Sequence, residues 1–322
     1  MRTNFLAIAL LLCTFGMAAP AQQQAQPPAS VAPFTLHDLG HDDWAAIDNP
    51  AAKAARSGAN AGFVIGADGV AVIDTFENIA AAQTLLDEIR KKTNLPIRFV
   101  VNTHYHLDHV AGNNIFAGAG ATILAQENVR AWERTENAKF FGPKITAAQK
   151  EEVASLGLPS ITYKDGVTLY LGARRLIVRS LPGHTGGDSV IYDPTANVVF
   201  CGDLFWNHTL PNLIDASTKP WIATLDTLLA DYPAATFVPG HGDEPGRAQD
   251  VRDFRGYLVD LRAAIRRAQA DGKSGDAVVA AVLPQLQQKY GSWNFFAFAK
   301  SDIKYTDEEL RGDKRIPKPR PQ

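Results

Sequence analysis

The sequence has very little cysteine and no excess of either charge. Only Cys13 and Cys201 are cysteines among 322 residues, and 32 Lys and Arg stand against 34 Asp and Glu. A balanced charge argues against nucleic acid as the partner. No internal repeat of solenoid or propeller length is apparent. The length suits one large domain with a well-filled core, or a domain with an appendage, and so allows an enzyme.

Residues 1–21 have the pattern of a removable export signal. Arg2 provides the positive start, Phe5–Leu12 the apolar stretch and Ala19–Ala21 a small-residue cleavage site. A retained membrane anchor is the less favoured alternative, because the apolar run is short for a membrane span and is followed by a proline. We therefore expect a periplasmic or secreted protein without stable membrane insertion, and a flexible leader over residues 22–33 that is rich in Gln, Pro and Ala.

Cysteine usage excludes a disulfide framework. Leu12, rather than a small residue, precedes Cys13, which argues against lipid attachment. Once the signal is removed, Cys201 is the only cysteine, so no intramolecular disulfide can form. We expect Cys201 to be a buried, inert thiol, although it lies two residues before Asp203 and could share a face with it.

Apolar periodicity predicts an alternation of strands and helices. A hairpin is expected over residues 62–74, with a turn at Gly66–Gly69 that demands positive φ. Further strands are expected at 97–101, 121–124, 167–171, 175–181, 189–192, 198–202 and 236–238, and helices around 82–89, 246–270 and 276–290. Such a pattern predicts sheets with helices packed outside them. We place one domain over 34–250 and a C-terminal helical extension over 251–322, with a frayed tail after Arg311.

The motif N-T-H-Y-H-L-D-H directly follows the apolar strand 97–101. In extended backbone His104 and His106 point to the same side, and a turn after Leu107 can bring Asp108 and His109 round from a second direction. Three of the eight histidines and an aspartate fall within six positions. Imidazole and carboxylate groups suit zinc. The alternative, polar loop residues that hydrogen-bond to one another, is much less favoured for so dense a group.

Three more candidate ligands follow apolar strands and are flanked by glycine. They are His184, Asp203 and His241. Glycine lets the backbone turn sharply and approach a crowded site closely. Each residue alone is a weak signal, but together they provide the remaining donors of a two-metal site.

In order along the chain, these motifs resemble those of the metallo-β-lactamase superfamily. The family has an Asp after the second strand, then H-x-H-x-D-H, a His, an Asp and a His. This sequence matches all five over residues 34–244, with Asp74, His104–His109, His184, Asp203 and His241. The resemblance implies an α+β fold, the four-layer αββα sandwich of that family.

The resemblance also implies the roles of these residues and a cofactor of two Zn²⁺ ions per chain. His104, His106 and His184 would hold the first metal, Asp108, His109 and His241 the second, and Asp203 would bridge the two. Asp74 would orient the ligand loop through hydrogen bonds, or else simply cap a turn. A hydroxide shared by two cations would be the nucleophile, with Asp108 as the catalytic residue that both ligates and orients it.

The sequence predicts individual residues of the metal site but only a broad class of substrate. We expect cleavage of an ester-, thioester- or amide-type bond in a small molecule. True β-lactamases of the superfamily lack a bridging carboxylate at the position of Asp203, whereas the glyoxalase II group keeps it. However, the residues around the last histidine, Pro239–Asp243, differ from the residues at that position in the glyoxalase II group.

Other functions stay open. They are β-lactamase activity as a main or side function, a persulfide dioxygenase with one iron held by His104, His184 and Asp203, and a non-catalytic zinc protein. A nuclease is disfavoured because the 203–241 stretch is too short for the inserted domain of that branch.

Three aromatic-containing segments are candidates for the surroundings of the site. Residues 139–144, with Phe140 and Phe141, and residues 205–213, with Trp206 and His208, could line a cleft or be plain surface loops. The aromatic residues Trp293, Phe295, Phe296 and Phe298 could cap the domain or pair with another subunit, and the oligomeric state is not predicted.

Overall fold

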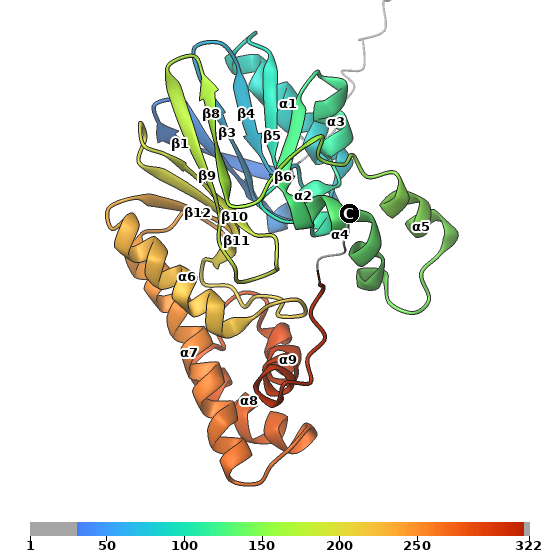
Figure 1. Cartoon of the computed structure of the whole chain (residues 1–322), viewed down its shortest axis with the longest axis vertical. Coiled ribbons are helices and arrows are strands. Elements are labelled where there is room, and N and C mark those ends of the chain that lie inside the picture. Colours follow the sequence, from blue (N-terminus) through green and yellow to red (C-terminus); the bar gives the residue numbers. More distant parts are fainter. Residues whose placement is uncertain (1–30, 319–322) are drawn as a thin grey trace, which may run out of the picture. The chain divides into compact units, whose positions relative to one another are not determined.

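The structure, a computed structural model, describes residues 31–318 (Figure 1). The predicted export signal and nearly all of the predicted leader therefore lie outside the described residues. Residues 32–318 belong to one compact unit, which is built on two β-sheets.

The first sheet has seven strands that lie in the order of the sequence. They are β1 (Phe34–Gly40), β2 (Asp43–Asp48), β3 (Ala61–Ile65), β4 (Val70–Ile73), β5 (Ile97–Val101), β6 (Thr122–Gln126) and β7 (Ile161–Tyr163). Neighbours are antiparallel from β1 to β4 and parallel from β4 to β7. Because β4 and β5 are parallel, their carboxyl ends meet at one edge, and the segments that start at Asp74 and Asn102 begin side by side.

The second sheet has five strands in the order β12-β11-β10-β9-β8. They are β8 (Gly166–Leu171), β9 (Arg174–Ser180), β10 (Ser189–Asp193), β11 (Val198–Trp206) and β12 (Thr236–His241). Only β11 and β12 are parallel. Their shared direction brings Asp203, near the end of β11, beside the end of β12. The β11 strand continues to Trp206, beyond the predicted end at 202.

The apolar core consists of three layers that the two sheets separate. Between the sheets, side chains such as Val64, Ile73 and Val101 from the first pack against Leu176 and Phe200 from the second. The helices α1 (Ile79–Lys92) and α3 (Asn113–Gly118) cover the outer face of the first sheet. The helices α6 (Thr218–Asp231) and α7 (Ala248–Ala270) cover the outer face of the second (Figure 1). The predicted αββα arrangement is confirmed.

The α1 helix shows how local sequence produces one of these layers. The Asn78 side chain accepts hydrogen bonds from the backbone N–H groups of Ala80 and Ala81, which caps the helix start. Ala82, Leu85 and Ile89 recur on one face and are fully buried. Burial of a Leu or Ile side chain contributes about 1.5–3 kcal/mol, so this apolar face holds the helix on the sheet.

Several elements were not predicted from the sequence. They include β1, β2, β7, α4 (Glu127–Glu136), the short helix η2 (Asn137–Phe141), α5 (Ala147–Ala154), α6 and α9 (Ala299–Arg311), besides the one-turn elements η1 (Pro50–Ala55) and α2 (Leu107–Val110). The β1 strand is mostly exposed and the α5 helix has a single buried residue, Val153. Their periodicity is therefore weak, and pairing or packing with distant segments decides their structure.

The C-terminal helical extension is confirmed. After α7 come α8 (Asp276–Tyr290), the short helix η3 (Phe296–Phe298) and α9, drawn in orange to red in Figure 1. Among residues 31–318, no helix has the length and apolar character to cross a membrane.

The predicted C-terminal tail makes defined contacts up to Lys318. Lys314 Nζ donates to the carbonyl oxygens of Leu213 and Ala216 (2.6 Å each). Trp132 Nε1 donates to the carbonyl oxygen of Lys318 (3.2 Å).

The β3–β4 hairpin is confirmed, but its predicted turn conformation is wrong. No residue of 66–69 has positive φ. Glycine is required there by close approach instead, because a Cβ on Gly66 would lie 2.2 Å from Leu171 Cβ and one on Gly69 would lie 2.4 Å from Arg98 Cδ. The turn is packed against the second sheet and β5, a contact that the local sequence does not reveal.

A buried charge cluster joins the two sheets. Arg174 Nη2 donates to Asp43 Oδ1 (2.5 Å) and Arg174 Nε donates to Asp193 Oδ2 (2.6 Å). Two carboxyl groups thus share one guanidinium. Burial, reinforced by the charge of Asp193, raises the pKa of Asp43 to about 8 against the opposing effect of Arg174.

We expect Asp43 to make the free energy of unfolding depend on pH. Because its folded-state pKa lies above the ordinary 3.8, its contribution is full below about pH 4 and is lost as the pH rises towards 8. Asp43→Asn should remove this dependence, so that between pH 5 and pH 8 the wild type loses roughly 1–3 kcal/mol more than the variant. Urea denaturation of both zinc-loaded proteins measures the difference, and parallel pH profiles would contradict it.

Candidate metal centre

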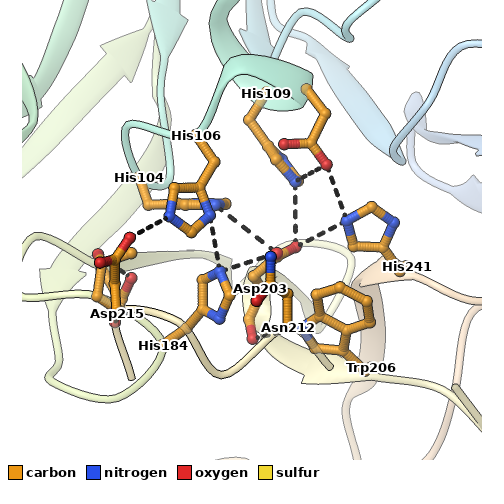
Figure 2. Close-up of polar contacts among 12 residues, drawn as sticks. His104, His106, His109, His184, Asp203, Trp206, Asn212, Asp215 and His241 are labelled. Carbon is orange, nitrogen blue, oxygen red and sulfur yellow. Dashed lines mark hydrogen bonds and ion pairs between the residues drawn. The ribbon is translucent and has the colours of Figure 1, made fainter. Parts of the chain in front are cut away.

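All seven predicted ligands lie together at the edge where β5, β11 and β12 end (Figure 2). His104 and His106 follow β5, and Asp108 and His109 lie on α2. His184 lies between β9 and β10, Asp203 on β11, and His241 at the end of β12. Within residues 31–318, His104, His106, His184 and Asp203 form one cluster of possible ligand atoms, and Asp108, His109 and His241 form a second.

In the first cluster, three imidazoles and one carboxylate converge. His184 Nε2 lies 2.9 Å from His106 Nδ1 and 3.1 Å from Asp203 Oδ2. His104 Nε2 lies 3.7 Å from the same Asp203 oxygen. These side chains are buried, so the cluster is a set of nitrogen and oxygen donors that are largely shielded from solvent.

In the second cluster, the other oxygen of Asp203 is the common neighbour. Asp203 Oδ1 lies 3.1 Å from His109 Nε2 and 3.5 Å from His241 Nε2. Asp108 Oδ2 lies 3.2 Å from His241 Nε2. Asp203 therefore stands between the clusters with one carboxylate oxygen towards each, as Figure 2 shows.

The donor atoms fit metal ions. Within residues 31–318, His104 Nε2, His109 Nε2, His241 Nε2 and Asp203 Oδ1 are buried and have no hydrogen-bond partner. A buried polar atom without a partner costs about 1–3 kcal/mol, and a cation among these atoms would remove that cost. Imidazole with carboxylate is a donor set that suits zinc.

The outward-facing nitrogens of two ligand histidines are held by Asp74 and Thr103. Asp74 Oδ2 lies 2.8 Å from His109 Nδ1 and accepts from Thr103 Oγ1 (2.7 Å), which in turn contacts His104 Nδ1 (3.1 Å). Asp74 Oδ1 also accepts from Thr103 N–H (2.8 Å). These contacts hold the imidazoles and the loop backbone in place, which is the orienting role predicted for Asp74.

Two ligands of the site have the protonation state that binds a cation, and two do not. Burial and the neighbouring His109 hold the pKa of His104 well below 6.5, so this imidazole stays neutral. Burial opposes ionisation of Asp203, but His241, His109 and the other imidazoles outweigh it and hold the pKa of this carboxyl well below 3.8. A neutral imidazole beside an ionised carboxylate is what a zinc ion binds. Burial opposes protonation of His109 and His241, but Asp203 and Asp108 outweigh it and raise the pKa of both imidazoles, that of His241 to about 9. A cation must therefore displace a proton from these two histidines.

Glycine at position 240 leaves room for Asp203. A Cβ there would lie 2.0 Å from Asp203 Oδ1, a distance that no side chain can adopt without displacing the carboxylate. This contact agrees with the prediction that glycine lets the backbone approach closely at this site.

A cleft of about 470 Å³ opens over Asp108, Asp203 and His241. Its apolar walls include the predicted residues Phe140, Phe141 and Trp206, together with Leu107, Phe295 and Phe298. The C-terminal aromatic residues Phe295 and Phe298 thus face the site within this chain. His208, which is exposed, is not among the lining residues.

A sequence profile described as the metallo-beta-lactamase superfamily matches residues 55–241. The match covers more than half of the chain and includes every residue of the two clusters. This chain belongs to the metallo-beta-lactamase superfamily.

Three relatives of this chain are between 24% and 30% identical to it. A linear primary-alkylsulfatase of Pseudomonas sp. is 24% identical over 70% of this chain, which spans about half (52%) of that protein's length. A metallo-beta-lactamase of Chryseobacterium indologenes is 28% identical over 58% of this chain and 73% of its own length. A hydroxyacylglutathione hydrolase of Brucella anthropi is 30% identical over 44% of this chain and 45% of its own length.

Solved structures support the fold. A metallo-beta-lactamase from Pontibacter korlensis superposes with a TM-score of 0.55 at 22% identity, and covers 70% of this chain and 98% of its own. This likeness shows that the chain has the sandwich fold of the metallo-beta-lactamase superfamily.

One residue that contacts the loop after β5, which carries several of the ligands, was not predicted from the sequence. Asp215, in the segment before α6, has Oδ2 3.0 Å from His106 Nε2 and accepts from Tyr105 Oη (2.5 Å). Lys139 Nζ lies 2.6 Å from both Asp215 oxygens. Burial opposes ionisation of Asp215, but His106 and Lys139 outweigh it and lower its pKa. No local signal marks Asp215, because its partners lie 76 to 110 positions away in the chain.

We expect Asp215→Asn to weaken metal binding in this metallo-beta-lactamase-fold protein by about 10- to 100-fold, because the carboxylate orients His106 and increases its basicity. Competition with a chromophoric chelator measures the affinity for zinc. The matched control is Asp226→Asn, an exposed aspartate of α6 that pairs with Arg255. Equal zinc affinity in the wild type and Asp215→Asn would show that Asp215 only shapes the loop.

Two other neighbours of the centre are structural. Trp206 stacks on His241 at 4.0 Å between ring centroids and donates from Nε1 to Asp203 O (3.0 Å), so it fixes the position of both residues. Cys201 is buried, and its thiol donates to Val199 O at 3.6 Å. Burial raises the pKa of Cys201, in agreement with the inert thiol predicted for it.

Proposed function

We propose that this chain is a binuclear zinc hydrolase that cleaves an ester-, thioester- or amide-type bond of a small molecule. One observation carries the proposal: each oxygen of Asp203 is directed to a different cluster of ligand side chains (Figure 2). A carboxylate in that position can bind two cations at once and hold them close together.

The ligand assignment follows from the clusters. His104, His106 and His184 would hold the first zinc, Asp108, His109 and His241 the second, and Asp203 both. Zinc held by these residues would supply Lewis acidity, which would lower the pKa of a bound water towards neutrality and polarise the bond to be cleaved.

The chain's own residues complete the chemistry. The Asp108 side chain is 31% exposed, in contrast to the buried Asp203, and it lines the cleft. It can therefore accept a hydrogen bond from the attacking water and orient it towards the substrate. Water adds across the bond, giving an acid and the protonated leaving group.

Asn212 can stabilise the developing negative charge on the substrate. It lines the same cleft, and its Oδ1 accepts a hydrogen bond from Ile214 N–H (3.1 Å). The amide NH₂ is then the end that can donate to a substrate oxygen.

The relatives support hydrolysis but differ in the bond that their names imply. They include an alkylsulfatase, a metallo-beta-lactamase and a hydroxyacylglutathione hydrolase. The carboxylate at Asp203 favours the wider hydrolase group over a dedicated β-lactamase, so β-lactam cleavage is proposed only as a side activity. The Asp108, His109 and His241 cluster beside the first argues against a dioxygenase with a single iron, which needs only His104, His184 and Asp203.

Metal analysis and a substrate panel test the proposal together. We expect close to two zinc ions per chain at saturation, because seven donors exceed what one tetrahedral ion can take. The zinc-loaded protein should cleave at least one class among carboxylic esters, thioesters, lactones, β-lactams, sulfate esters and phosphodiesters. One tightly bound iron without zinc, or two zinc ions without activity on any class, would overturn it.

We also propose that the protein is exported. The sequence pattern of residues 1–21 supports this proposal. Mass spectrometry of the protein from the periplasm of an exporting host should find a mature chain that begins near Gln22, and an intact Met1 in that fraction would contradict it.

A further inference from the structure

The cleft over the metal centre has a pair of phenylalanines beside each ligand cluster. Phe140 and Phe141 come from the η2 region, and the Phe140 ring lies 4.9 Å from that of His106 in the first cluster. Phe295 and Phe298 come from the C-terminal extension. The Phe295 ring lies 6.1 Å from that of His241 in the second cluster and 5.7 Å from that of Phe298.

These rings are accessible from the cleft. Phe140 and Phe295 are each 37% exposed, whereas most large apolar side chains of the described residues are buried. Both line the 470 Å³ cavity, to which Leu107 and Trp206 add further apolar surface. A concave apolar surface beside convergent polar groups is the usual form of a small-molecule site.

The position of Phe295 is imposed by its neighbours. Its backbone is in the left-handed region (φ 57°, ψ 28°), which is unfavourable for a residue other than glycine. Asn294 holds the segment: its N–H donates to His208 O, its carbonyl accepts from Leu210 N–H, and its Nδ2 donates to Asp243 Oδ2, each at 2.9 Å. The surrounding structure therefore maintains a strained conformation that keeps this ring at the cleft.

The charges of the cleft do not suit a polyanion. Among its lining residues in the described part of the chain, Arg56 is the only Lys or Arg. Its guanidinium already pairs with Asp48. Outside the metal ligands, Glu77 adds a carboxylate to the same lining, so the walls of the cleft in the described part of the chain have no group of Lys or Arg side chains that could bind further phosphates away from the metal centre.

We propose that the substrate carries a hydrocarbon chain that lies against these phenylalanines while the bond to be cleaved lies over Asp203. The inference rests on the proposed function only for the position of that bond. The aromatic surface supplies the binding energy and the polar residues supply the chemistry, so the substrate class is an ester-type compound with an acyl or alkyl chain.

The first test is a chain-length series. For the zinc-loaded protein, kcat/KM for p-nitrophenyl alkanoates should rise from acetate to decanoate by up to about fourfold per methylene until the cleft is filled, since a buried CH₂ contributes about 0.8 kcal/mol. The common leaving group confines the difference to the acyl chain. Hydrolysis without a dependence on chain length would overturn this inference and leave the proposed function standing.

Substitutions of the phenylalanines test whether they cause the dependence of kcat/KM on chain length. Phe140→Ala and Phe295→Ala should each flatten the chain-length slope, mainly through KM. The matched control is Tyr170→Ala on β8, where an aromatic side chain is 57% exposed away from the cleft, and its slope should equal that of the wild type. An unchanged slope in both phenylalanine variants would show that the chain binds elsewhere.

A binding measurement keeps the inference testable without turnover. Calorimetric titration of the zinc-loaded protein with butanoate, hexanoate, octanoate and decanoate compares ligands whose carboxylates are the same. Kd should fall along the series in the wild type and in Tyr170→Ala, and less steeply in Phe295→Ala. Equal Kd values along the series would overturn the inference even if the cleaved bond has been misassigned.

Discussion

Replacing Asp203 by alanine is expected to reduce the zinc content of the saturated protein from about two ions to about one per chain and to lower hydrolysis about a thousandfold or more. The side chain has one oxygen 3.1 Å from His184 Nε2 and the other 3.1 Å from His109 Nε2, so it is shared by the two clusters. Its loss would leave Asp108 as the one carboxylate of the second cluster, while three histidines would remain to hold a cation in the first.

Metal content and hydrolysis of the best substrate should be measured side by side. The matched control is Asp231→Ala at the end of α6, an exposed aspartate that pairs with Arg179. An exposed ion pair contributes about 0–1 kcal/mol, so this control should keep both zinc ions and full activity. Two zinc ions with unchanged hydrolysis in Asp203→Ala would show that another residue bridges the metals. A protein emptied of iron by the same change would favour the dioxygenase alternative.

Removing the metals with a chelator is expected to lower Tm by roughly 10 °C or more. A ligand at a thousand times its Kd stabilises the folded state by about 4 kcal/mol per site, and 1 kcal/mol corresponds to about 2–4 °C in a domain of 150–250 residues. The structural reason is a set of buried atoms that have no hydrogen-bond partner within residues 31–318, namely His104 Nε2, His109 Nε2, His241 Nε2 and Asp203 Oδ1, and that a cation would satisfy.

Thermal unfolding with and without chelator, followed by addition of zinc, measures this effect. Added zinc should restore the original Tm. Asp203→Ala should show a smaller shift than the wild type, because it has about one ion to lose. A wild-type Tm that does not respond to chelator or zinc would contradict the assignment of these clusters as metal sites.

Much of the fold could be predicted from the sequence because its signals are local. The buried strands β5, β11 and β12 are short apolar runs, and the α7 and α8 helices have clear apolar periodicity. The ligand residues follow such strands directly, so their approximate place in the fold follows from position in the sequence. Elements with weak periodicity, such as β1 and α5, were missed because their pairing and packing depend on distant segments.

The sequence by itself determined which residues could form the metal centre: the spacing of His104 to His109 and the glycine-flanked His184, Asp203 and His241 are properties of single short segments. Only the tertiary structure decided how Asp203 is shared between two clusters, that Asp215 holds His106, and that Phe295 of the C-terminal extension lines the cleft. These are contacts between residues that are far apart in the chain. Such contacts depend on how the sheets and helices pack, and no local pattern of residues encodes them.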